Sequence, residues 1–169
     1  MTHSVSTYLN TSYDVLRRTA AKYLGTDPLS FGTTDLVHET VLKFIQSGTT
    51  FKDEAHFLYS SWRVFRQVII NRARARTAEK RGGDADRVEL DAAMASTEHD
   101  PELAVELGQL ISELEEIDPR SASAVVMRSF YGLTTAETAR LLGVSVATAE
   151  RDYAAGRLWL VDRLRDERS

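Results

Sequence analysis

The sequence contains no cysteine, so the chain can form no disulfide, no thiolate zinc site and no cysteine nucleophile. Its histidines show no spacing typical of metal ligands, and His38 beside Glu39 is better explained by packing on a helix than by catalysis. The histidines are His3, His38, His56 and His99. We therefore expect no catalytic residue, no metal site and no cofactor, and the chain is not predicted to be an enzyme.

The sequence also lacks any apolar run close to the roughly 20 residues that a membrane-spanning helix needs. Its first residues, Met-Thr-His-Ser-Val-Ser, do not show the basic and then apolar pattern of a secretion signal. With 43% hydrophobic and 27% charged residues, the chain has the composition of a folded, soluble protein. We expect it to stay in the cytoplasm, without a membrane partner.

Convincing strand alternation is absent too, and hydrophobic residues recur instead at helical spacing. In the first half, turn-forming residues at 25–28 and 47–50 separate three such segments, and Gly82-Gly83 follows the third. The stretch from there to residue 100 is acidic, rich in small residues and without helical period, as is typical of a linker. The sequence predicts an all-α fold of two small helical bundles, residues 1–81 and 101–169, joined by an acidic linker over residues 82–100.

The net charge of −4 argues against a nucleic-acid partner, but charge is unevenly distributed along the chain. Residues 1–81 hold 12 Lys/Arg and 7 Asp/Glu, residues 82–121 hold 2 and 12, and residues 122–169 hold 7 and 6. Because salt screens Coulomb forces beyond about 10 Å, a polyanion would respond to the basic block from Trp62 to Arg81 rather than to the acidic middle. A solvated basic face is an equally good explanation of this block.

The C-terminal part carries the signals of a helix-turn-helix. Thr134 and Glu137 form a capping box at the start of one short helix. Gly143 can end that helix with a positive φ, and Ser145 can cap the next. Ala139 is small enough to let the two helices cross closely. The second bundle is therefore predicted to contain a helix-turn-helix, although a simple hairpin of two packed helices is the alternative.

In a helix-turn-helix the second helix enters the major groove, and its first turns contact base edges and phosphates. The residues expected to fill the core beneath the two helices are Leu142, Val144 and Tyr153. The exposed candidates for DNA contact are Ser145, Ala147, Thr148 and Arg151. Arg151 is the one able to make a two-pronged contact to guanine or to hold a phosphate.

The third segment of the first bundle, His56 to Arg76, mixes aromatic residues with arginines. Only Glu79 is close in sequence, so these arginines cannot all pair with neighbours. Aromatic faces beside a basic surface suit the unstacked bases of a single strand. The alternative is that the apolar residues of this segment are simply core; they are Phe57, Leu58, Trp62 and Phe65.

In this order, the helix-turn-helix, the aromatic and basic helix and the preceding Asp35-Leu-Val-His-Glu-Thr-Val-Leu-Lys43 resemble an extracytoplasmic-function (ECF) sigma factor of the sigma-70 family. Four segments resemble a subfamily associated with serine/threonine protein kinases: Leu36-Val-His-Glu39, Ala55-His-Phe57, Lys80-Arg-Gly-Gly83 and Thr148-Ala-Glu-Arg-Asp152. The similarity covers nearly the whole chain. It implies an alternative sigma factor that binds core RNA polymerase, recognises the −35 and −10 promoter elements and promotes strand opening.

The resemblance also implies which residues meet each partner. Those matching the surface for the clamp helices of the polymerase's largest subunit are Asp35, Leu36, Glu39, Thr40 and Lys43. Those matching the helix that meets the −10 element and the melted strand are Arg63, Arg66, Gln67, Asn71, Arg72 and Arg74. Arg151 and its neighbours match the reader of the −35 element, and residues 84–100 match the linker that threads the polymerase. Residues 1–81 would then bind polymerase and melt the promoter, and residues 101–169 would bind DNA.

The sequence departs from the family pattern in two places. Most such factors carry an acidic cluster before Leu36, but here the run is Gly-Thr33-Thr34-Asp35, with one acid. A phosphate on Thr33 or Thr34 would add about −1.5 to −2 charge at a helix N-terminus. We hypothesise that a serine/threonine kinase thereby switches on polymerase binding, with Thr34 the better candidate; helix capping is the alternative role. The second departure is Glu150, where many relatives have a basic residue.

Two rival functions fit parts of the sequence. A helix-turn-helix transcriptional regulator that does not bind core polymerase would explain residues 119–166 but not the aromatic and basic helix. An anti-sigma protein or kinase-bound adaptor would share the fold but would not support transcription. A DNA footprint that appears only with core polymerase separates a sigma factor from the first rival.

Overall fold

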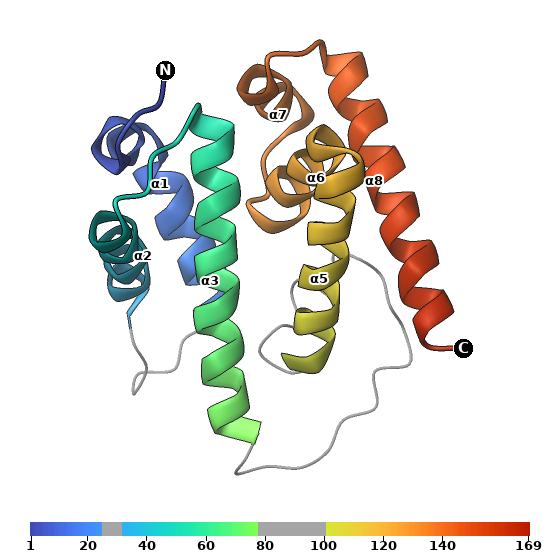
Figure 1. Ribbon diagram of the computed structural model, residues 1–169, viewed down its shortest axis with the longest axis horizontal. Helices are drawn as coiled ribbons and strands as arrows, with labels where there is room; N and C mark the ends of the chain where they lie inside the picture. The colour runs from blue at the N-terminus through green and yellow to red at the C-terminus, as the bar shows by residue number, and fades with distance from the viewer. Residues whose placement is uncertain (25–31, 78–100) are drawn as a thin grey trace. The chain divides into compact units, whose positions relative to one another are not determined.

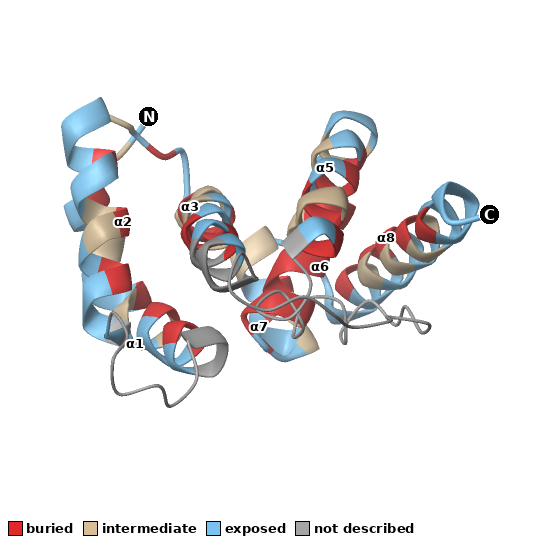
Figure 2. Ribbon diagram, turned by 90° about the horizontal axis from the view of Figure 1, so that it is seen from below, coloured by how far each residue is buried: buried red, intermediate tan, exposed pale blue. Residues whose placement is uncertain are grey.

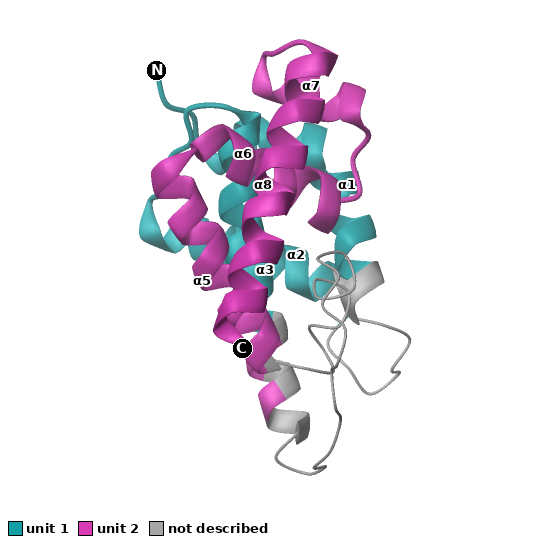
Figure 3. Ribbon diagram, turned by 90° about the vertical axis from the view of Figure 1, so that its right-hand side faces the viewer, with its two compact units in different colours: residues 1–69 teal, residues 70–169 magenta. Residues whose placement is uncertain are grey.

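The computed structural model describes residues 1–24, 32–77 and 101–169 of the chain. In that part every regular element is a helix, apart from one antiparallel bridge between His3 and Phe51 (Figure 1). The prediction of an all-α fold is confirmed. The chain divides into two compact units, Met1–Ile69 and Ile70–Ser169 (Figure 3). The linker predicted over residues 82–100 and the turn predicted at 25–28 lie outside the described residues, so the division at residue 82 stays a prediction.

The first unit contains α1 (Val5–Leu24), α2 (Thr33–Ser47) and most of α3 (Glu54–Thr77). Apolar residues at helical spacing give each helix a buried side, on which Leu16 and Leu36 are fully buried. An aromatic cluster completes the core, with the Phe51 ring centroid 4.9 Å from that of Phe44 and 5.1 Å from that of Phe57. In the predicted turn, Gly48 ends α2 in the left-handed region at φ 63°, a conformation that glycine adopts without steric cost.

The second unit contains α5 (Pro101–Ile117), α6 (Pro119–Val125), η1 (Val126–Phe130), α7 (Thr135–Leu142) and α8 (Val146–Glu167), together with the last residues of α3. Its core is built on α5, whose buried residues recur every three or four positions: Leu103, Leu107, Leu110, Ile111 and Leu114. Buried and exposed residues of α8 lie on opposite sides of that helix (Figure 2). None of the described helices is both long enough and apolar enough to cross a bilayer.

Helices α6 and α8 approach closely at Gly156, a buried residue of α8. A Cβ atom at this position would lie 2.8 Å from Val125 Cγ2 and 3.0 Å from the backbone oxygen of Ser121. Both distances are shorter than ordinary carbon contacts, so glycine is needed for this crossing. The crossing fixes α8 against the start of α6.

The helix predicted from Pro119 to about Tyr131 is present but changes its hydrogen-bonding pattern. It begins at Asp118, whose carboxylate accepts a bond from the backbone N–H of Ser121 at 3.2 Å and another from the Ser121 hydroxyl at 2.6 Å. From Val126 onward it becomes a π-helix, in which the Tyr131 N–H donates to the Val126 carbonyl at 3.1 Å. Such single π turns inside α-helices are rare and often lie near functional sites.

Candidate nucleic-acid interface

Helices α7 and α8 are joined by a short turn whose capping agrees with the sequence prediction. The Glu137 N–H donates to Thr134 Oγ1 at 3.1 Å, and the Thr134 N–H donates to Glu137 Oε2 at 2.8 Å. Gly143 ends α7 at φ 66°, and Ser145 Oγ accepts the Thr148 N–H at 3.1 Å. The predicted capping box, left-handed glycine and N-cap serine are therefore confirmed.

The residues packed beneath this turn are not all those expected. Ala139 is buried as predicted, and Ala149 of α8 is buried as well. Leu142, Val144 and Tyr153, predicted to be core, are each only partly buried. Small side chains therefore make most of the close contact, because bulky ones would hold the two helices apart.

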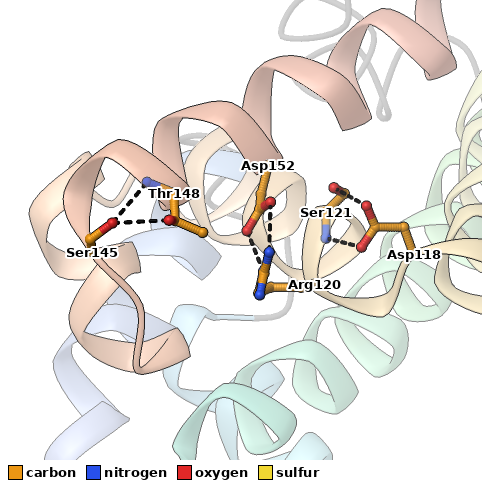
Figure 4. A network of polar contacts seen from close by, with 6 residues as sticks. All are labelled: Asp118, Arg120, Ser121, Ser145, Thr148 and Asp152. Carbon is orange, nitrogen blue, oxygen red and sulfur yellow. Dashed lines mark hydrogen bonds and ion pairs between the residues drawn. The ribbon is translucent and has the colours of Figure 1, made fainter.

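The first turns of α8 present a mixed surface. Ala147 and Arg151 are exposed, and Arg151 forms no ion pair within the described part of the chain. Ser145 Oγ and Thr148 Oγ1 lie 2.9 Å apart and hydrogen-bond to each other, so these two hydroxyls are partly occupied by helix capping (Figure 4). Arg151 is therefore the side chain of this set most available to an external partner.

An ion pair from α6 supports the opposite side of α8. Arg120 donates through Nε to Asp152 Oδ2 and through Nη2 to Asp152 Oδ1, the second bond measuring 3.2 Å (Figure 4). The Asp152 side chain is only 9% exposed, and its hydrogen bond raises the pKa of Arg120. Sequence reasoning missed this pair, because its members are 32 residues apart.

A second polar network joins η1, α7 and α8 through Glu150. Glu150 Oε2 accepts from Thr135 Oγ1 at 3.0 Å and from Arg128 Nη1 at 3.4 Å. Arg128 Nη1 also donates to Thr135 Oγ1, and the Arg128 guanidinium lies 4.5 Å from the centroid of the Tyr153 ring. The residue that departs from the family pattern is thus held in place by two neighbouring elements.

The aromatic and basic segment forms α3, and its apolar residues are interior. Phe57, Leu58, Trp62 and Phe65 are all buried. The Phe57 ring also contacts Phe44 and Phe51 in the aromatic cluster of the first unit. This favours the core interpretation of these four residues over a stacking platform for bases.

The polar residues of α3 lie in several different environments. Arg63 lies 5.7 Å from the centroid of the Tyr59 ring, and Arg66 lies 5.3 Å from that of Trp62. Arg74 forms an ion pair with Glu102 of α5 at 3.2 Å, so one arginine finds a partner far away in sequence. Gln67 and Asn71 are exposed, whereas the side chain of Arg72 lies outside the described residues.

The α2 residues predicted to meet polymerase divide between the surface and the core. Asp35 and Lys43 are exposed, and the partly exposed Glu39 pairs with Lys43 at 3.5 Å. Leu36 and Thr40 are buried, so they can only support that surface from beneath. Sequence reasoning missed two exposed apolar residues on the same helix, Leu42 at 52% and Ile45 at 60%.

At the start of α2, the one acid of the Thr-Thr-Asp run is already engaged. Asp35 Oδ2 accepts the Gly32 N–H at 2.9 Å, which completes half of a capping box. Gly32 is the N-cap and has no side chain with which to complete the other half. Thr34 is exposed, and the side chain of Thr33 lies outside the described residues.

Comparison with known proteins assigns this all-helical chain to a class of transcription factors. The family model described as ECF sigma factor matches residues 3–166, nearly the whole chain. The chain belongs to the ECF sigma factor family, whose members are alternative sigma factors that bind core RNA polymerase and promoter DNA. No curated protein and no solved structure matches it.

Proposed function

We propose that this sigma factor uses α8 to read the −35 element, α3 to bind the −10 element and the melted strand, and α2 to bind the clamp helices of the polymerase's largest subunit. The observation that carries the proposal is the capped pair α7 and α8, with Arg151 exposed in the first turns of the second helix. That is the arrangement expected of a helix-turn-helix.

The −35 contact is expected to centre on Arg151. Its guanidinium can donate two hydrogen bonds to guanine or one strong bond to a phosphate. Ala147 adds a small apolar surface suited to a thymine methyl group. Ser145 and Thr148 contribute mainly by fixing the start of α8, because their hydroxyls already hydrogen-bond to each other.

On α3, the proposed contacts rest on polar and cationic side chains rather than on buried aromatic rings. Arg63, Gln67, Asn71 and Arg74 are exposed, whereas Arg66 is partly buried. Contacts to the melted strand would offset the few kcal/mol that unstacking costs. Arg72 belongs to the same proposal on the basis of the family resemblance.

On α2, charged and apolar side chains occur together on the exposed surface. Asp35, Glu39 and Lys43 supply charges, and Leu42 and Ile45 supply apolar area. Exposed apolar residues beside charged ones are typical of a protein interface. This supports α2 as the polymerase-binding helix.

We further propose that phosphorylation of Thr34, or of Thr33, strengthens polymerase binding, with a serine/threonine kinase as the partner. The helix starts with no side-chain cap at Gly32, and its one nearby acid is already hydrogen-bonded. A phosphate placed there would interact favourably with the helix N-terminus and supply the missing negative charge. Thr34 is the better candidate because its side chain is exposed.

Run-off transcription with purified core polymerase tests both parts of the proposal. We expect promoter-specific transcripts from the full chain, and at least about tenfold tighter polymerase binding after phosphorylation, as roughly 1.4 kcal/mol of added attraction would give. Thr34→Ala should abolish that gain, and Thr11→Ala, an exposed threonine of α1, is the matched control. Equal affinities for phosphorylated and unmodified protein would refute the phosphorylation step. A footprint without polymerase and no transcript would favour an independent helix-turn-helix regulator.

A further inference from the structure

We propose that Glu150 is a specificity-determining residue that selects a cytosine within the DNA sequence contacted by α8. The inference rests on the proposed function, because it requires α8 to lie in the major groove. It concerns a residue that departs from the family pattern, and it assigns that residue a positive role in base selection.

Glu150 lies where a base-reading side chain should be. It is in the second turn of α8, directly before Arg151, and its side chain is 61% exposed. The N-terminal turns of a recognition helix are the part that reaches base edges. A carboxylate at this position would therefore lie among the donors and acceptors of the groove.

The side chain is held by one of its two oxygens. Oε2 accepts both bonds, from Thr135 and from Arg128, whereas Oε1 has no hydrogen bond within the described part of the chain. Arg128 is itself fixed by the Tyr153 ring and by the Thr135 hydroxyl. One oxygen is thus anchored to η1 and α7 while the other is left for a ligand.

The chemistry of a carboxylate limits what that ligand can be. An ionised carboxylate only accepts hydrogen bonds, so it is repelled by guanine O6 and N7 and by thymine O4. The cytosine N4 amino group is the donor to which Glu and Asp side chains characteristically bind in the major groove. Phosphates would repel the carboxylate as well, and Arg128 reduces this repulsion by pairing with it.

The simpler explanation is that the network only ties α7 to α8. A partly exposed ion pair contributes at most about 1 kcal/mol to stability. A purely structural role would change stability and leave base preference alone, so the two explanations differ in a measurable readout.

The test is binding-site selection from a promoter library with a randomised −35 region, using holoenzyme formed from the full chain and core polymerase. Wild type should enrich cytosine at one position, with a discrimination of about 10-fold over guanine or thymine. Glu150→Gln retains an oxygen acceptor for Thr135 and Arg128 but adds an N–H donor. It should lose the cytosine preference at that one position and keep the others.

Two further variants complete the test. Asp162→Asn removes a carboxylate from an exposed position further along α8, and its selected sequence should equal that of wild type. Thr135→Val removes one anchor and should weaken the cytosine preference. Thermal unfolding of each variant separates these effects from loss of the fold.

The outcomes distinguish the two proposals. If wild type enriches a sequence and Glu150→Gln enriches the same one, Glu150 does not determine specificity and the inference is wrong. Absence of cytosine at every enriched position would overturn it as well. If wild-type holoenzyme enriches no −35 sequence at all, the proposed reading of the −35 element by α8 fails, and the inference fails with it.

Discussion

Gly156 shows how a single missing side chain fixes the position of a helix. Glycine normally weakens a helix by about 1 kcal/mol relative to alanine. At this position the added Cβ would instead collide with Val125 and with the Ser121 carbonyl, both of which are buried. Steric exclusion by immobile neighbours therefore outweighs the gain in helix propensity.

We predict that Gly156→Ala destabilises the chain by about 1–2 kcal/mol, because overpacking typically costs more than the propensity gain returns. Urea unfolding measures the loss. Ala155→Gly, at the exposed neighbouring position, reports the propensity effect alone. An increase in stability in Gly156→Ala would show that α6 and α8 can separate at low cost.

Asp118 gives the start of α6 a pH-dependent cap. The hydrogen bond from the Ser121 hydroxyl is the main cause that lowers the pKa of Asp118 below its usual value of 3.8. A lowered pKa means that the folded state favours the ionised carboxylate. Its stabilisation is therefore fully present above the unfolded pKa and is lost as pH falls through the folded one.

We predict that Asp118→Ala costs about 1 kcal/mol at pH 7 and that the difference from wild type shrinks as pH falls below about 4. Chemical denaturation across this pH range measures it. Asp118→Asn keeps a capping oxygen without a titrating group, so its stability should not follow the same pH dependence. A constant difference between wild type and Asp118→Ala down to pH 2 would contradict the assignment.

At the scale of elements, the Arg120 and Asp152 pair joins α6 to α8 on the side opposite the proposed DNA contact. Asp152 is nearly buried, so losing Arg120 would leave a carboxylate without its ionic partner in the interior. The pair sets the orientation of α8 more than it adds to stability.

We predict that Arg120→Met is more destabilising than the double variant Arg120→Met with Asp152→Leu, since the double variant leaves no buried charge unpaired. Denaturation of both single variants and of the double variant forms a complete cycle. Arg140→Met, which changes an exposed arginine of α7, is the matched control. Additive losses in the cycle would mean that the two side chains do not depend on each other.

At the scale of the whole molecule, what could be predicted from the sequence depends on how far apart the interacting residues lie. The capping box at Thr134 and Glu137 spans three residues, so both its members and its geometry were predictable. The helical stripes that form the core were predictable for the same reason, because periodicity is a local property.

The contacts that position the candidate site were not predictable. Arg128 and Glu150 are 22 residues apart, and Arg74 and Glu102 are 28 apart, so no local spacing links them. The partial exposure of Leu142 and Val144 was also missed, because residue type alone does not tell which side of a short helix meets its neighbours. Packing between helices decides such details.

The π turn at η1 constrains how this chain can change in length. A π turn closes its hydrogen bond one residue later than an α turn, so this segment contains one residue more than an unbroken α-helix would need. Removing that residue would restore α-helical bonding but rotate everything that follows by about 100° about the helix axis. Thr134 would then start α7 in a different direction, so the phase of this helix is part of the specification of the DNA-binding end.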